Sequence, residues 1–308
     1  RRPHGSAGMS VEFCGLELDH PIINGSGTFD ALAARGVFGE ELLRAFPFAA
    51  YVSKTITLEP REGNPPPRLW EPAGGLINSI GLPNKGLAGY LAEDLPVLGT
   101  LPVPLITNVM GSTAAEIAEL VQACDGCAEI AAVELNVSCP NVKTGLDIGA
   151  DPRQLEEVVR MVRPLTGKPL IVKLTPNAAD VAACALAAQA GGADAVSLIN
   201  TLRAMALEPV SRNSPSGVPS PRPWLGAGTG GLSGPAIRAI ALAQVAAVTG
   251  RVEIPVIGMG GVSSAAHARE LLSVGARLVA VGTESFRDPT AGSRIARELG
   301  SLPSPGLA

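Results

Sequence analysis

The feature that most constrains the fold of this chain is a repeated alternation of short apolar runs with longer segments rich in alanine and leucine. The short runs are typical of buried strands, and the longer segments have helical spacing. The strands are predicted at residues 21–24, 49–54, 104–109, 132–136, 170–173, 195–199, 255–258 and 278–281. The helices are predicted near residues 30–45, 85–95, 114–124, 152–165, 178–190, 235–249, 265–274 and 289–299.

Strands that are apolar throughout and alternate with helices indicate a parallel sheet covered on its faces. Eight such units in one chain favour an α/β fold of the closed (β/α)8 TIM-barrel type over an open doubly wound sheet. A chain of 308 residues is a common length for a single barrel domain. We therefore expect one domain over residues 10–300, with flexible termini at residues 1–9 and 301–308.

Composition and charge argue against several classes of protein. Lys and Arg number 24 and Asp and Glu 28, and only 3% of residues are aromatic, which disfavours nucleic-acid binding. The alanine-rich segment 181–190 is too short to span a bilayer, and the N-terminus lacks the apolar stretch of a secretory signal. We therefore expect no membrane contact. Five thinly spread cysteines indicate a reduced, cytoplasmic protein and not a disulfide framework.

Three connections, at residues 57–84, 137–151 and 201–232, are too long to be simple turns. All three follow predicted strands, so in a barrel they lie at the carboxyl-terminal face, where the active sites of this fold are found. The Ser-, Pro- and Gly-rich stretch 211–223 fits a mobile insert without chemistry at least as well as a binding loop.

Five polar residues lie at the carboxyl-terminal ends of the predicted strands, at this same face. They are Lys54, Asn108, Asn136, Lys173 and Asn200. Any one could be a satisfied structural group, but five together point to a bound ligand that supplies their partners. The two lysines fit neutralisation of an anionic or electron-rich ligand, and one of them fits Schiff-base formation equally well.

Two glycine turns follow the last two strands, at residues 258–261 and at Gly282 and Thr283. Exposed backbone N–H groups in these turns predict the phosphate site that barrels commonly carry there. The glycine spacing is not the GxGxxG of a dinucleotide-binding Rossmann fold.

Residues 134–141 place the thiol of Cys139 among a hydroxyl and two carboxamides, directly after a strand. Such a thiol can act as nucleophile or base. The only histidines are at positions 4, 20 and 267, which argues against a Cys–His acyl-transfer pair. Cys124 and Cys127 form a CxxC without further ligands at metal spacing, so we interpret that pair as incidental.

An ordered set of motifs resembles class 1 dihydroorotate dehydrogenase over about residues 10–290. The motifs occupy residues 26–29, 53–55, 59–68, 78–84, 134–141, 172–177, 199–201, 230–236 and 258–262. The resemblance implies an FMN-binding barrel that oxidises (S)-dihydroorotate to orotate in pyrimidine synthesis. It also implies that Cys139 takes the C5 proton while hydride from C6 passes to the flavin.

The same resemblance assigns binding roles position by position. The implied substrate-binding residues are Lys54, Asn78, Ser79, Ile80, Gly81, Leu82, Asn136, Asn141, Asn200 and Thr201. The implied flavin contacts are Ser26, Lys54, Thr55, Asn108, Asn136, Lys173, Ile199, Gly234, Gly260, Gly261, Gly282 and Thr283.

Residues 59–68, 199–201 and 232–235 resemble the class 1B catalytic subunit. That resemblance implies a homodimer core and a heterotetramer with a partner that carries FAD and a [2Fe–2S] cluster and passes electrons to NAD. The chain lacks four clustered cysteines for such a cluster of its own. Residues 78–84 are nearer to the fumarate-using class 1A pattern. Dihydropyrimidine dehydrogenase is the closest alternative enzyme, and a Schiff-base barrel lyase is a more distant one.

Overall fold

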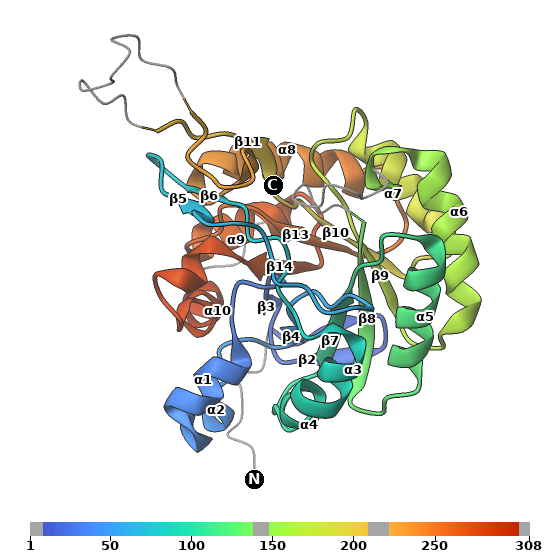
Figure 1. The fold of residues 1–308 in the computed structure, drawn as a ribbon. Coiled ribbons are helices and arrows are strands. Elements are labelled where there is room, and N and C mark those ends of the chain that lie inside the picture. The colour runs from blue at the N-terminus through green and yellow to red at the C-terminus, as the bar shows by residue number, and fades with distance from the viewer. Residues whose placement is uncertain (1–8, 138–147, 209–221, 302–308) are drawn as a thin grey trace.

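The computed structural model describes residues 9–137, 148–208 and 222–301, which form a barrel ringed by helices (Figure 1). Eight strands form one parallel sheet in the order β3-β14-β13-β10-β9-β8-β7-β4. They are β3 (Ile22–Asn24), β4 (Tyr51–Val52), β7 (Leu105–Val109), β8 (Ile130–Asn136), β9 (Leu170–Lys173), β10 (Ala195–Leu198), β13 (Val256–Met259) and β14 (Leu278–Val281). Each overlaps one predicted strand, so the barrel prediction is confirmed.

A side chain joins the two strands at the ends of this sheet, β3 and β4. Asn24 is fully buried; its Oδ1 accepts from Val52 N at 2.8 Å, and its Nδ2 donates to Val52 O at 2.8 Å. The carboxamide thus makes the pair of bonds that a neighbouring peptide group makes in a strand ladder. The backbone bond from Ala49 N to Ile22 O, at 3.0 Å, completes the seam.

Alternate residues of the barrel strands face the lumen and the helices, and both faces are apolar. One buried cluster lines the lumen, with residues such as Ile23, Val52, Ile106, Ala132, Ile171, Ala195, Ile257 and Ala280. A hairpin of β1 (Val11–Phe13) and β2 (Leu16–Leu18) adds Phe13 and Leu18 to this cluster and covers the amino-terminal end of the barrel. This hairpin was not predicted from the sequence.

The helices pack around the barrel. They are α1 (Ala31–Phe38), α2 (Glu40–Arg44), α3 (Gly86–Gly89), η1 (Tyr90–Asp94), α4 (Leu95–Leu98), α5 (Ala114–Asp125), η2 (Ile148–Ala150), α6 (Pro152–Val162), η3 (Arg163–Leu165), α7 (Val181–Ala190), η4 (Pro235–Ile237), α8 (Arg238–Thr249), α9 (Ala265–Ser273), η5 (Thr283–Phe286) and α10 (Ala291–Ser301). All eight predicted helices have a counterpart. The prediction of one helix over 30–45 is wrong in its continuity, because Gly39 adopts a φ of 55° and separates α1 from α2. Helix α7 begins three residues later than predicted because the side chain of Asp180 caps it.

Two of the three long connections pair with each other. Their strands β5 (Leu69–Trp70), β6 (Leu76–Asn78), β11 (Leu202–Ala204) and β12 (Gly230–Ser233) form an antiparallel sheet in the order β11-β12-β6-β5. Figure 1 shows these distant segments side by side. The rings of Trp70 and Trp224 lie 5.0 Å apart over its small core. The loops are thus built as a second sheet, which local sequence patterns did not reveal.

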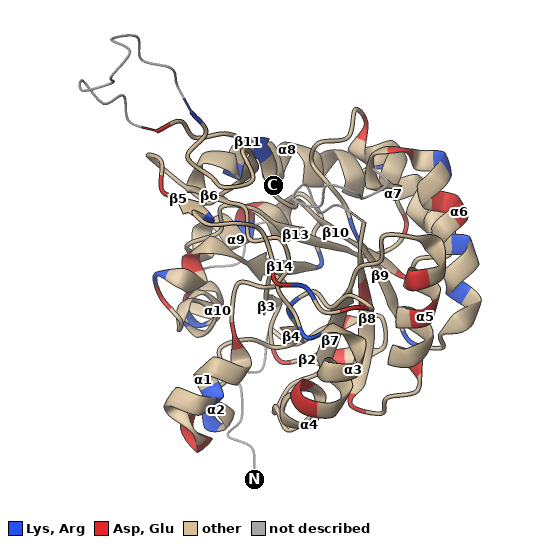
Figure 2. Ribbon diagram, viewed as in Figure 1, with Lys and Arg blue, Asp and Glu red and all other residues tan. Residues whose placement is uncertain are grey.

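Several sequence predictions lie outside the described residues. These are Cys139 and Asn141, most of the stretch 211–223, and nearly all of both expected flexible termini. In the part of the chain that is described, none of the helices combines the length and apolar character needed to cross a membrane. Acidic and basic residues both lie along α6 on the outside of the barrel (Figure 2).

Candidate active site

The lumen becomes polar towards the carboxyl ends of the strands, where Asn108, Glu134 and Ser197 form a buried group that we call the lumen cluster. Glu134 is 2% exposed, and both of its carboxylate oxygens accept hydrogen bonds. Asn108 Nδ2 donates to Oε1 at 2.5 Å, and Ser197 Oγ donates to Oε2 at 2.8 Å. Among the described residues nothing donates to Asn108 Oδ1, although that atom is buried. The cluster therefore leaves one acceptor unused.

Predicted site residues from three strands meet beside the lumen cluster. Ser26 Oγ donates to Ser53 O at 2.8 Å and lies 3.4 Å from Thr55 Oγ1. Asn136 Nδ2 donates to the same Thr55 oxygen at 3.4 Å. The structure therefore brings Ser26, Thr55 and Asn136 together, as expected from the sequence.

The two predicted lysines differ in environment. Lys54 is exposed, whereas Lys173 is 6% exposed and is paired in register with Asn136 and Ser197. They do not lie on adjacent strands, because β7 and β8 separate β4 from β9. One cation thus borders solvent and the other lies at the buried edge of the lumen.

The residues after β10 are held by a carboxamide from a neighbouring loop. Asn177 Nδ2 donates to Thr201 O at 3.1 Å, and Arg203 N donates to Asn177 Oδ1 at 3.0 Å. Asn200 Oδ1 accepts from Thr201 N at 2.8 Å, and Ile199 is buried. These bonds position the segment 199–201 at the start of the second sheet.

The segment 78–82 has a constrained backbone. Gly81 has a φ of 78°, and a Cβ there would lie 2.4 Å from Asn64 N. Leu82 has a φ of 55°, a conformation that costs a side-chain-bearing residue on the order of 1 kcal/mol. Asn84 Nδ2 donates to Leu82 O at 2.8 Å and holds it there. Strain retained by specific bonds is common at functional sites.

Besides the predicted residue Asn78, two side chains that were not singled out from the sequence, Asn64 and Asn84, support this segment. Asn64 Nδ2 donates to the buried Ser79 Oγ at 2.9 Å, and Asn64 N donates to Ile80 O at 3.0 Å. Asn78 Nδ2 donates to Gly231 O at 3.3 Å, across the second sheet. Asn64 and Asn84 lie within the motifs 59–68 and 78–84, so their positions were visible although their roles were not.

A cavity lies beyond the carboxyl ends of β13 and β14. The residues that line it are Gly75, Gly234, Pro235, Gly261, Val262, Ser263, Thr283, Glu284 and Arg287. Of the predicted flavin contacts, Gly234, Gly261 and Thr283 line it, whereas Gly260 and Gly282 do not. Of the five predicted flavin contacts in or near the glycine turns, the structure thus brings three together around one cavity.

The glycines at this end differ in how strictly the fold requires them. Gly260 has a φ of 132°, and a Cβ there would lie 2.5 Å from Ala241 Cβ, so packing against α8 demands glycine. Gly261 has a φ of 69° and a similar conflict with Arg238 Cβ at 2.8 Å. A Cβ added at Gly282 would have its nearest neighbouring atom 3.7 Å away, an ordinary contact. Packing within the protein therefore does not demand glycine at 282.

The CxxC pair lies away from this site, at the end of α5. Cys124 is fully buried, and burial raises the pKa of its thiol to about 12. Cys127 Sγ donates to Ala123 O at 3.3 Å, as a helix-terminal side chain commonly does. Within the described ranges no group of three or more His, Cys, Asp or Glu side chains is arranged to hold a metal ion.

A (β/α)8 barrel with polar side chains at the carboxyl ends of its strands and a cavity after its last two strands is the architecture of a barrel enzyme. The family model for dihydroorotate dehydrogenase matches residues 8–302. The chain belongs to the dihydroorotate dehydrogenase family, a family of flavin-dependent enzymes.

Three similar proteins carry the same description, "Dihydroorotate dehydrogenase B (NAD(+)), catalytic subunit". The protein from Geobacter sp. (strain M21) is 44% identical over 292 residues, 94% of this chain and 92% of the relative. That from Geobacter sulfurreducens is 43% identical over 295 residues, with the same coverage of 94% and 92%. That from Desulforudis audaxviator is 44% identical over 294 residues, 94% of this chain and 91% of the relative. The resemblance to class 1B is confirmed, and it outweighs the dihydropyrimidine dehydrogenase and lyase alternatives.

Proposed function

We propose that residues 10–300 form the catalytic subunit of an NAD-linked dihydroorotate dehydrogenase, which uses FMN to oxidise (S)-dihydroorotate to orotate in the cytoplasm. The observation that carries the proposal is the unused acceptor Asn108 Oδ1 in the lumen, on the far side of the barrel from the glycine-lined cavity. Three strands separate β7 from β13 in the sheet, so the two features can bind opposite ends of one extended ligand.

The residues at both ends fit FMN. An oxidised isoalloxazine ring has one N–H donor, N3–H, which suits the lone acceptor of Asn108. The phosphate suits the cavity lined by Gly234, Gly261 and Thr283. Lys173 would place a cation near the ring, where it favours charge on the reduced form. FMN, when bound, supplies the two-electron acceptor for the hydride of the substrate.

The other assigned flavin contacts complete this arrangement. They are Ser26, Lys54, Thr55, Asn136, Ile199, Gly260 and Gly282, and they rest on the family resemblance. Ser26, Thr55 and Asn136 lie in one hydrogen-bonded group, which supports their joint assignment.

The substrate would bind among carboxamides, hydroxyls and backbone groups. Carboxamides offer both donors and acceptors, which suits a pyrimidine with alternating C=O and N–H groups. The exposed ammonium of Lys54 suits the carboxylate of dihydroorotate. The assigned residues are Lys54, Asn78, Ser79, Ile80, Gly81, Leu82, Asn136, Asn141, Asn200 and Thr201.

Cys139 is the proposed base that removes the C5 proton, and it follows Asn136, at the end of β8, by three residues. The purified protein is expected to be yellow and to bleach when dihydroorotate is added without oxygen. Cys139→Ser should slow bleaching at neutral pH by about 100-fold, because a hydroxyl is a weaker base than a thiolate. Stopped-flow absorbance at the flavin maximum measures this rate.

Each outcome of that experiment has a separate meaning. A colourless protein that FMN does not reconstitute would contradict the proposed function. An unchanged bleaching rate in Cys139→Ser would remove Cys139 from the mechanism. Perturbation of the flavin spectrum by uracil but not by orotate would instead favour a dihydropyrimidine substrate.

The relatives are named as catalytic subunits, a name that implies another subunit. We propose a homodimer of this chain in a heterotetramer with an electron-transfer partner that carries FAD and a [2Fe–2S] cluster. Purification from the native source should recover such an iron–sulfur flavoprotein with this chain. Recovery of the chain alone, with NAD reduction intact, would contradict the partner assignment.

A further inference from the structure

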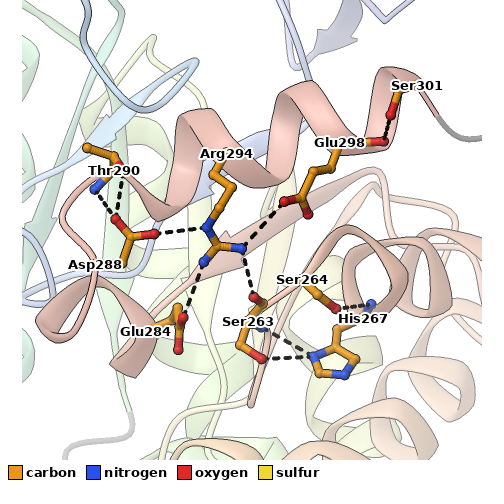
Figure 3. A network of polar contacts seen from close by, with 9 residues as sticks. All are labelled: Ser263, Ser264, His267, Glu284, Asp288, Thr290, Arg294, Glu298 and Ser301. Atoms are coloured by element: carbon orange, nitrogen blue, oxygen red, sulfur yellow. Dashed lines mark hydrogen bonds and ion pairs between the residues drawn. The ribbon is translucent and has the colours of Figure 1, made fainter.

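One guanidinium joins the two loops that border the glycine-lined cavity. Arg294 on α10 donates from Nε to Asp288 Oδ2 at 2.9 Å, from Nη2 to Glu284 Oε1 at 3.2 Å, and from Nη1 to Ser263 O at 3.2 Å (Figure 3). Glu284 belongs to η5, which follows β14, and Ser263 precedes α9, which follows β13. We call these four residues the Arg294 network.

Two members of this network line the cavity itself. Ser263 and Glu284 border the same space as Gly261 and Thr283, whereas Arg294 is not among the lining residues. Because Glu284 is a lining residue, its negative charge would oppose the binding of a phosphate in this cavity unless a cation balances it. The cavity therefore contains one feature that favours an anion and one that disfavours it.

Arg294 offsets an excess of negative charge. It lies within ion-pair distance of three carboxylates, Glu284 at 3.2 Å, Asp288 at 2.9 Å and Glu298 at 3.9 Å. The one basic residue among the described residues that line the cavity, Arg287, pairs with Glu71 at 2.9 Å. Loss of Arg294 would leave the phosphate beside unbalanced carboxylates.

The network is also held in one geometry. Thr290 donates to Asp288 Oδ1 from its hydroxyl at 2.6 Å and from its backbone N–H at 2.9 Å. The hydroxyl bond is the main cause that lowers the pKa of Asp288, so this carboxylate anchors the guanidinium in ionised form. Ser263 is fixed from its other side, because its N–H donates to His267 Nδ1 at 3.3 Å (Figure 3).

We propose that Arg294 is a positioning residue that allows this cavity to bind an anion. Its guanidinium neutralises Glu284 and links Ser263 to η5 through hydrogen bonds, and it does not itself contact the anion. The inference rests on the proposed FMN function, since it assigns the cavity to the FMN phosphate. It requires that Arg294 discriminate FMN from riboflavin, which has the same ring and no phosphate.

The test titrates the flavin-free full chain with FMN and with riboflavin and follows quenching of flavin fluorescence. Arg294→Gln should weaken FMN binding about tenfold at low salt and leave riboflavin binding unchanged. The FMN defect should shrink at about 0.5 M salt, because the added repulsion is screened. Arg294→Lys should retain most of the affinity, and Glu284→Gln added to Arg294→Gln should restore it. Arg297→Gln, an exposed neighbour on α10, is the matched control.

Equal loss of FMN and riboflavin affinity in Arg294→Gln, or no restoration by Glu284→Gln, would overturn the inference. If the unaltered chain binds neither flavin, the proposed function fails separately. Inorganic phosphate then decides the inference, because phosphate should raise the melting temperature of the unaltered chain and not that of Arg294→Gln. Equal stabilisation of both proteins by phosphate would contradict it.

Discussion

The lumen cluster and the Arg294 network are both polar groups organised around one charged residue, yet they differ in burial and in the elements that carry them. Asn108, Glu134 and Ser197 come from three barrel strands and are at most 2% exposed. The side chains of Arg294, Glu284 and Asp288 come from a helix and loops and are 32%, 21% and 28% exposed.

This difference decides what each group contributes. A buried polar group that loses its partner keeps its full desolvation cost, about 1–3 kcal/mol for each group. A partly exposed ion pair contributes at most about 1 kcal/mol to stability, because water and salt screen it. The lumen cluster should therefore govern folding as well as ring binding, whereas the Arg294 network should govern the charge preference of the site with little effect on stability.

The largest expected effect comes from removal of the acid at the centre of the lumen cluster. Glu134→Leu leaves Asn108 Nδ2 and Ser197 Oγ buried without their acceptor, so the free energy of unfolding should fall by about 3 kcal/mol. Urea denaturation measures the loss. Glu157→Gln, on the surface of α6, should change stability by less than about 0.5 kcal/mol. Equal stability of the two variants would contradict the inference that the lumen cluster contributes more to folding than exposed charged groups do.

An intermediate effect is expected at the cavity. Gly261→Ala places a Cβ 2.8 Å from both Arg238 Cβ and Gly234 O at a φ of 69°, and should lower the free energy of unfolding by about 2 kcal/mol. FMN affinity should fall as well. Thermal unfolding measures the loss of stability, and a flavin titration measures the loss of affinity. Gly126→Ala, where the nearest atom is 3.6 Å from the new Cβ, should be near neutral. Tolerance of Gly261→Ala would show that the turn relaxes.

The smallest effect concerns the ionisation of Asp288. Its pKa lies below the ordinary value of 3.8, chiefly through the Thr290 hydroxyl, so the folded state favours the ionised form. The resulting stability is fully present above about pH 4 and is lost as the pH falls through the lower folded-state pKa. Asp288→Asn should be slightly less stable than the unaltered chain near neutral pH, and the difference should shrink on acidification below about pH 4. A stability difference between the two proteins that grows on acidification would contradict the lowered pKa of Asp288.

The contrast between the two groups also explains which site residues were accessible to sequence reasoning. Lys54, Asn108, Asn136 and Lys173 were found because they follow apolar runs, and the ends of parallel strands converge in any barrel. Glu134 stood in a quoted motif, but its role depends on Asn108 and Ser197, which lie 26 and 63 residues away. The role of Arg294 could not be predicted, because the sequence of an amphipathic helix does not indicate which residues of other elements its polar side chains contact.

The second sheet was missed for the same reason. Asn78 and Gly231 are 153 residues apart and pair only because two barrel loops emerge on one face. Strand patterns as short as those of β5, β6, β11 and β12 cannot be recognised without their partners.

The sequence by itself determined the eight strand and helix units, the face where polar residues gather, and the family, because these depend on local periodicity and ordered motifs. Only the tertiary structure showed that Asn24 joins β3 to β4 and that Asn108 Oδ1 has no donor among the described residues. It also showed that Arg294 is the cation that balances Glu284. Those outcomes depend on hydrogen bonds and charges between segments distant in the chain, and their geometry exists only once the strands have assembled.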